Sequence, residues 1–204
     1  MRPVAARTES RDRIVRATVQ TLATEGYAAT TARSVARTGG FAPGVIYYHF
    51  DDLEDLLVAA AQYTAQTRLA RYREELGDVT SATELLERLE RLHTEDVADG
   101  HIAAVQELTA ASSSSPKLAA GIRTQIKPWQ DFAEQIAGRF VTRTPFAALI
   151  PIPELARAAI ALFLGMEMLS HLDTDRARSD AFFTSAKQAA TLFDVMAPAP
   201  GKLP

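Results

Sequence analysis

Helix-favouring residues fill nearly every long segment of this chain, and short clusters of helix breakers separate those segments. Ala, Leu, Arg, Glu and Gln dominate the segments, and β-branched alternation over four or more residues is nearly absent. The sequence therefore predicts an all-α fold. We expect helices at about 10–25, 32–38, 43–49, 51–76, 81–98, 101–113, 116–140, 152–172 and 176–196, after a loose arm at 1–8. Pro128 is expected to kink or split its helix.

Composition excludes several classes of protein. With 204 residues, 47% of them apolar, the chain is long enough for one ordinary domain or for a small and a medium one. It has no cysteine, so disulfides and cysteine-based zinc sites are excluded. The longest uncharged run is 13 residues, Thr38–Phe50, and a spanning helix needs about 20. The N-terminus lacks the apolar region of a signal peptide, so we expect a soluble, cytoplasmic protein.

Charge is distributed unevenly along the chain. Residues 1–50 contain seven arginines and three acidic residues, whereas the whole chain has a formal charge of −3. The first segment is therefore basic and the remainder acidic. This asymmetry indicates that the N-terminal part meets a polyanion, although chance clustering in an Arg-rich chain would give the same pattern.

The segment Thr30–Phe50 has the features of two short helices that cross at a tight turn. Thr30 and Thr31 offer a helix cap, Ala36 is small where the helices approach each other, and Gly40 can adopt the positive φ of the turn. Apolar contacts would come from Val35, Phe41, Ile46 and Phe50. The outer face of the second short helix could then enter a major groove. That face carries Pro43, Gly44, Val45, Tyr47, Tyr48 and His49.

Residues 10–60 resemble the DNA-binding domain of the TetR family of regulators. The matching features are Gly26-Tyr27, Thr30-Thr31, Val35-Ala36, Gly40 and the string Gly44–Phe50. The resemblance implies roles for single residues. Thr31 would cap its helix and bond a phosphate, Arg33 would contact a base or phosphate, and Tyr47 and His49 would contact the backbone. Base edges would face Pro43, Val45 and Tyr48, a largely apolar set that suits thymine methyl groups.

Two positions depart from the family pattern. Ala42 stands where the family usually has a Ser or Thr cap, a loss worth about 1 kcal/mol. Leu53 replaces a common phosphate-binding Lys, and the neighbouring residues are acidic. We hypothesise that an arm bearing Arg2 and Arg7 compensates by reaching an adjacent minor groove, the alternative being a tail without a role.

Two late helices have apolar positions at heptad spacing, which is typical of helices packed side by side. The family forms a homodimer through its last two helices, and a two-fold operator requires one. The same spacing is compatible with packing inside one chain. The candidate interface residues are Leu155, Ala159, Leu162, Phe182, Ala186, Ala189 and Phe193.

The middle helices would enclose a pocket for a small-molecule effector, as the resemblance implies. Its wall would be apolar and aromatic, which favours an apolar or amphipathic ligand, with Trp129 as the preferred contact. For each candidate, ordinary core packing is the favoured interpretation. The candidates are Leu89, His93, Leu108, Trp129, Phe132, Ile136 and Met166.

These observations predict a DNA-binding domain at 1–51 and an effector-binding and dimerisation domain at 52–204. We expect a non-enzymatic regulator without cofactor or metal, a repressor released from a palindromic operator by its effector. One alternative is a regulator without a small-molecule effector. Another is an all-α metal enzyme, for which Glu90 and His93 supply one Glu-x-x-His pair where two are needed.

Overall fold

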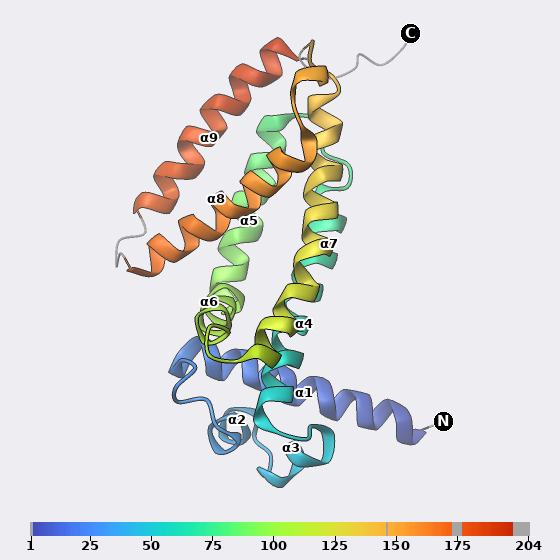
Figure 1. The fold of residues 1–204 in the computed structure, drawn as a ribbon, viewed down its shortest axis with the longest axis vertical. Helices are drawn as coiled ribbons and strands as arrows, with labels where there is room; N and C mark the ends of the chain where they lie inside the picture. Colours follow the sequence, from blue (N-terminus) through green and yellow to red (C-terminus); the bar gives the residue numbers. More distant parts are fainter. Residues whose placement is uncertain (1, 146, 173–176, 198–204) are drawn as a thin grey trace. The chain divides into compact units, whose positions relative to one another are not determined.

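Helices account for the whole fold of the computed structural model, which describes residues 2–145, 147–172 and 177–197 (Figure 1). No strand occurs among these residues, and the all-α prediction is confirmed. The elements are α1 (Arg2–Glu25), α2 (Ala32–Gly39), α3 (Gly44–His49), α4 (Leu53–Leu76), α5 (Ala82–Ala98), α6 (His101–Ala111), α7 (Pro116–Val141), the 3₁₀ helix η1 (Ala147–Leu149), α8 (Ile152–Leu172) and α9 (Ala177–Met196).

Local capping explains the boundaries that the sequence predicted well. The Thr31 side chain accepts a hydrogen bond from the Ser34 N–H, and the Ser34 side chain accepts one from the Thr31 N–H, so α2 begins with a reciprocal capping box. Gly40 ends α2 in the left-handed region, with φ 65°, where a side chain would be strained. At the start of α4, the Asp52 carboxylate accepts the Asp55 N–H at 2.7 Å.

One prediction about a helix end is wrong, and one of the two outcomes expected at Pro128 is excluded. Helix α1 begins at Arg2 rather than near Ser10, so residues 2–8 are helical and no loose arm precedes them. Proline is tolerated in a first turn, so Pro3 does not prevent the helix from beginning at Arg2. Helix α7 runs through Pro128 without a split. Packing of Trp129 and Phe132 in an apolar cluster helps to stabilise the helix despite the missing N–H.

The described chain divides into two packing units. Unit 1 comprises Met1–Arg68 and Glu95–Ile126, and unit 2 comprises Leu69–Thr94 and Lys127–Pro204. These are units of packing, whereas the division predicted at residue 51 is one of function and stays a prediction. Among the helices that the structure describes, none is both long and apolar enough to cross a membrane.

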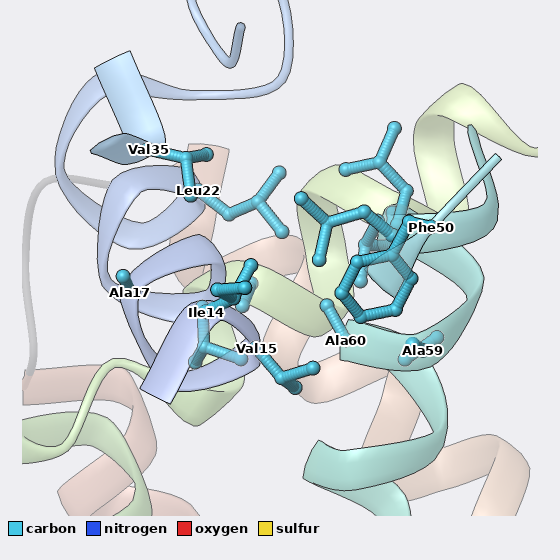
Figure 2. Close-up of a cluster of buried hydrophobic side chains, with 14 of the residues drawn as sticks. Ile14, Val15, Ala17, Leu22, Val35, Phe50, Ala59 and Ala60 are labelled. Carbon is cyan, nitrogen blue, oxygen red and sulfur yellow. The ribbon is translucent and has the colours of Figure 1, made fainter. Parts of the chain in front are cut away.

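The core of unit 1 joins the first three helices to parts of α4, α6 and α7. Ile14 of α1, Ile46 of α3 and Leu56 of α4 are fully buried in one cluster. In Figure 2 the Phe50 ring, just after α3, lies beside Ala59 and Ala60 of α4. The remaining contributions come from α6 and α7, through Ala104, Leu108, Ala111 and Leu118. The orientation of α3 therefore depends on side chains distant in sequence.

Unit 2 is held together by a second apolar cluster and by polar groups at helix ends. Arg139 of α7 donates to the carbonyl oxygens of Leu76 and Gly77 at 2.7 Å each, which satisfies the C-terminus of α4. Asp194 of α9 accepts the backbone N–H groups of Ala82 and Thr83 at 2.7 and 2.9 Å, so it caps α5 from another helix. The consecutive helices α8 and α9 run antiparallel (Figure 1).

The cap formed by Asp194 predicts a pH-dependent contribution to stability. Burial acts to raise the pKa of Asp194, but hydrogen bonds from Thr83 and Ala82 outweigh it and the pKa is lowered. A carboxylate whose pKa is lowered by folding stabilises the fold at pH values above its pKa in the unfolded chain, which is about 3.9. It loses this contribution as the pH falls through its pKa in the folded state. Asp194→Asn should lower the free energy of unfolding by about 0.5–2 kcal/mol at pH 7, measured by urea titration.

The difference between Asp194→Asn and the unsubstituted protein should shrink as the pH falls below about 4. Asp131→Asn is the matched control, because Asp131 is exposed and pairs with Lys127 on its own helix. Equal effects of the two substitutions at pH 7 would contradict the assignment of Asp194 as a cap.

Candidate nucleic-acid interface

Helices α2 and α3 meet at a turn that is held by buried apolar side chains and by Arg13 of α1. Val35 and Ile46 are fully buried beneath the two helices, and Phe41 packs against the same cluster. The guanidinium of Arg13 donates to the Gly39 carbonyl from Nη2 at 2.7 Å and from Nε at 3.1 Å. The predicted packing of this segment is confirmed, and Arg13 of α1 is an additional support for the turn.

The face of α3 opposite this core is exposed. The side chains of Tyr47 and Tyr48 are 58% and 68% exposed, which is unusual for aromatic rings in a single chain. Pro43 and Gly44 are also exposed, whereas Val45 is half-buried against the core. The N-cap of α3 is Pro43 rather than Ala42, and it makes no side-chain cap hydrogen bond.

Candidate residues on α2 lie near the start of the helix. Thr31 caps α2, as the resemblance implies, and its own side chain is exposed. Arg33 is exposed two residues after the cap. Arg37, further along α2, instead forms a two-pronged contact with the Glu25 carboxylate, at 2.8 Å to each oxygen. The guanidinium of Arg37 is therefore held by the Glu25 carboxylate.

His49 lies at the edge of the candidate face, where α3 meets α1. Its Nε2 lies 3.1 Å from the Ser10 hydroxyl. Burial, followed by the nearby charges of Arg7 and Arg11, lowers the pKa of His49, so the ring is neutral at pH 7. The sequence did not reveal this contact, because Ser10 was expected at the start of a helix rather than within it.

The acidic residues at the start of α4 are engaged by α7. The Lys117 ammonium lies 2.6 Å from an Asp55 oxygen and 3.2 Å from an Asp52 oxygen, and the Ser115 hydroxyl donates to Glu54. Hydrogen bonding to Asp55 makes the largest contribution to raising the pKa of Lys117, and hydrogen bonding to Asp52 adds to it. Leu53 packs against the core. The acidic neighbourhood is thus partly neutralised within the protein.

The candidate effector residues do not all lie together. Trp129 and Phe132 are in edge contact, with ring centroids 6.3 Å apart, and Leu89 and Ile136 pack in the same cluster of unit 2. Leu108 instead belongs to the core of unit 1, because α6 packs on α1. Tyr72, which the sequence analysis missed, stacks edge-on against Trp129 at 5.2 Å.

His93 and Met166, the other two effector candidates, are buried in unit 2. The His93 Nδ1 lies 3.2 Å from a Glu167 oxygen, with both side chains about nine-tenths buried, at 10% and 7% exposure. The rings of Phe163 and Phe183 flank the imidazole at 5.8 and 5.5 Å. Glu90, which shares a Glu-x-x-His spacing with His93, contacts Lys187 at 2.8 Å instead. The two residues therefore have separate partners.

The candidate dimer residues divide between exposed and partly buried positions. Leu155, Ala159, Leu162 and Ala189 are exposed, whereas Phe182, Ala186 and Phe193 are partly buried in their own chain. Phe193 packs against the cluster of unit 2. Leu192 and Val195, which lie outside the predicted seam, are 67% and 76% exposed. Helices α8 and α9 thus leave several apolar side chains exposed.

Comparison with known proteins gives this geometry a context. Residues 14–60 match the model of the family described as bacterial regulatory proteins, tetR family. The HTH-type transcriptional regulator UidR of Escherichia coli K12 is 25% identical over 126 residues. That match covers 62% of this chain and 63% of UidR, which is less than two thirds of the relative.

Two solved structures share the fold over most of the chain. FadR of Bacillus subtilis, in complex with stearoyl-CoA, has a TM-score of 0.71 at 18% identity, covering 88% of this chain and 96% of FadR. A transcriptional regulator of Saccharomonospora viridis, in complex with choline, has a TM-score of 0.70 at 21% identity, covering 92% and 96%. Through residues 14–60 the chain belongs to the tetR family of bacterial regulatory proteins, and the two solved structures show that it shares their fold.

Proposed function

We propose that this protein is a dimeric, ligand-responsive regulator that binds a palindromic operator through α2 and α3 and acts as a repressor. The exposed pair Tyr47 and Tyr48 is the observation that carries the DNA-binding part. Two adjacent exposed aromatic rings on a helix that is fixed from beneath are suited to a partner surface. The groove of DNA admits a helix in this position.

The proposed contacts divide into positioning and reading. Thr31, Arg33, Tyr47 and His49 would bond phosphates, with His49 acting as a neutral hydrogen-bonding group. Pro43, Gly44, Val45 and Tyr48 would lie along base edges. The DNA-binding function is assigned to residues 1–51 and the remaining functions to residues 52–204.

The dimer is proposed to form through α8 and α9. The apolar side chains exposed on these helices include Leu155, Leu162, Leu169, Leu192 and Met196. A surface of this kind is rare on a soluble monomer, and a two-fold dimer would cover the same patch on both copies. A two-fold arrangement also matches the symmetry of a palindrome.

The effector is proposed to be a small apolar or amphipathic molecule that contacts unit 2. The aromatic cluster of Tyr72, Trp129 and Phe132 supplies apolar surface, and the buried pair His93 and Glu167 supplies polar groups. Stearoyl-CoA, the ligand of the FadR neighbour, is amphipathic and supports this class of molecule, whereas choline, the ligand of the other neighbour, is a small polar cation. A regulator without a small-molecule effector is the alternative.

Selection of bound sequences from random duplex DNA tests the proposed function as a whole. We expect enrichment of a palindrome whose half-sites are about one helical turn, 34–36 Å, apart, because two α3 helices would enter successive major grooves. Failure to enrich any sequence would remove the basis for a sequence-specific regulator. An enriched site without two-fold symmetry would contradict the dimer.

Leu162→Arg tests the dimer surface. Leu162 is 58% exposed on α8, and a charge at the centre of an apolar interface would be buried without a partner. We expect a dimer for the unsubstituted protein and at least a tenfold weaker association for the variant, by analytical ultracentrifugation. Leu149→Arg is the control, because Leu149 is 79% exposed in η1. Equal masses for the two variants would exclude α8 as the interface.

Trp129 allows the effector site to be tested directly, because it is the only tryptophan of the chain. Titration with stearoyl-CoA, and separately with choline, should release bound DNA and change Trp129 fluorescence over the same concentration range. Release of DNA without a change in fluorescence would move the site away from Trp129. If neither compound releases DNA, a wider set of metabolites is screened. Persistent binding throughout that set would favour a regulator without an effector.

A further inference from the structure

Three side chains of α1 meet three consecutive residues at the end of α3. The Arg7 guanidinium carbon lies 5.4 Å from the centre of the Tyr48 ring, and that of Arg11 lies 5.0 Å from the centre of the Phe50 ring. Between them, the Ser10 hydroxyl lies 3.1 Å from His49 Nε2. Positions i, i+3 and i+4 share one face of a helix, so this is a single matched contact between α1 and α3.

The positive charge at this contact comes from the arginines alone. The pKa of His49 is lowered by burial and by the charges of Arg7 and Arg11, so the imidazole adds no charge near neutral pH. Helical spacing places Glu9 and Asp12 away from the face that carries Arg7 and Arg11. The end of α3 therefore has a cationic flank that the acidic residues of α1 do not neutralise.

Arg7 has the geometry of a residue that is held ready for an anion. Its side chain is exposed, and so is the Tyr48 ring beside it. A guanidinium that stacks on an aromatic ring keeps its planar edge of N–H donors free, and that edge matches the oxygens of a phosphate. The ring restricts the arginine before any ligand arrives, which lowers the entropy lost on binding.

We propose that Arg7, positioned by the Tyr48 ring, binds a DNA backbone phosphate beside the groove that α3 enters. This inference rests on the proposed function and adds a contact outside the helix-turn-helix. It also replaces the flexible arm of the sequence-based hypothesis. Because α1 is helical from Arg2, Arg7 is presented by a rigid helix next to α3, so its target is the flanking backbone.

The salt dependence of binding to random-sequence duplex DNA tests this role, because each phosphate contact contributes about 0.9 to the slope of log K against log salt. Arg7→Ala should make this negative slope shallower by about 0.9 per chain, and by about twice that for a dimer. Arg16→Ala is the matched control. Arg16 is exposed on the same helix, nine residues from Arg7 and so on its opposite side, and its loss changes the net charge equally.

Substitutions of Tyr48 test the positioning role. Tyr48→Leu removes the ring and should reduce the slope as Arg7→Ala does, whereas Tyr48→Phe keeps the ring and should reduce it less than Tyr48→Leu. Adding Arg7→Ala to Tyr48→Leu should then cause little further loss. Circular dichroism spectra and melting temperatures identify any variant that fails to fold, and Arg7→Lys provides a milder change that retains the charge.

The outcomes separate this inference from the proposed function. If the unsubstituted protein shows no salt-dependent binding to DNA, the proposed function is wrong. If it binds and Arg7→Ala has the same slope as Arg16→Ala, the role of Arg7 is wrong and the function stands. If Arg7→Ala lowers the slope and Tyr48→Leu does not, Arg7 binds phosphate without help from the ring, which overturns the positioning role.

Discussion

The orientation of α3 depends on one buried cluster that no single segment of the chain can form alone. Ile14, Ile46 and Leu56 are fully buried in this cluster, and each comes from a different helix. A six-residue helix such as α3 has little stability of its own, because nucleation is costly and few hydrogen bonds are formed. Tertiary packing therefore holds α3 in place and leaves Tyr47 and Tyr48 exposed.

This dependence gives the helix-turn-helix a wider support than its sequence motif suggests. Leu108 of α6 and Leu118 of α7 belong to the same core, and a Cβ atom at Gly121 would lie only 2.7 Å from Val58 Cγ1. Lys117 and Ser115 add polar contacts to the first turn of α4. The turn that follows α3 is therefore supported by a helix that begins more than sixty residues later.

Features coded by neighbouring residues were predictable from the sequence, and features that join distant residues were not. The cap at Thr31 and the turn at Gly40 follow from local stereochemistry, and the helix boundaries follow from breakers. The Asp194 cap spans more than one hundred residues, and so no local pattern indicates it. Likewise, the sequence placed Leu108 among the effector candidates, because no local pattern specifies which core receives it.

The sites show the same division. The motif located the exposed face of α3, because Gly44–Phe50 is contiguous. It missed the partnership of Arg7 with Tyr48, which exists only because α1 extends two turns beyond its expected start. The heptad count on α9 also selected Phe193, whose side chain packs inside the chain, while Leu192 beside it is exposed.

One hydrogen bond of unit 1 has a mechanical consequence. The Tyr27 N–H, just beyond α1, donates to the Glu107 carboxylate of α6 at 2.6 Å. A movement that separated α6 from the end of α1 would break a charge-assisted bond and leave a partly buried amide without an acceptor, at a cost of about 1–3 kcal/mol. A force on α6 that supplies less free energy than this cost is therefore expected to move the end of α1 together with α6.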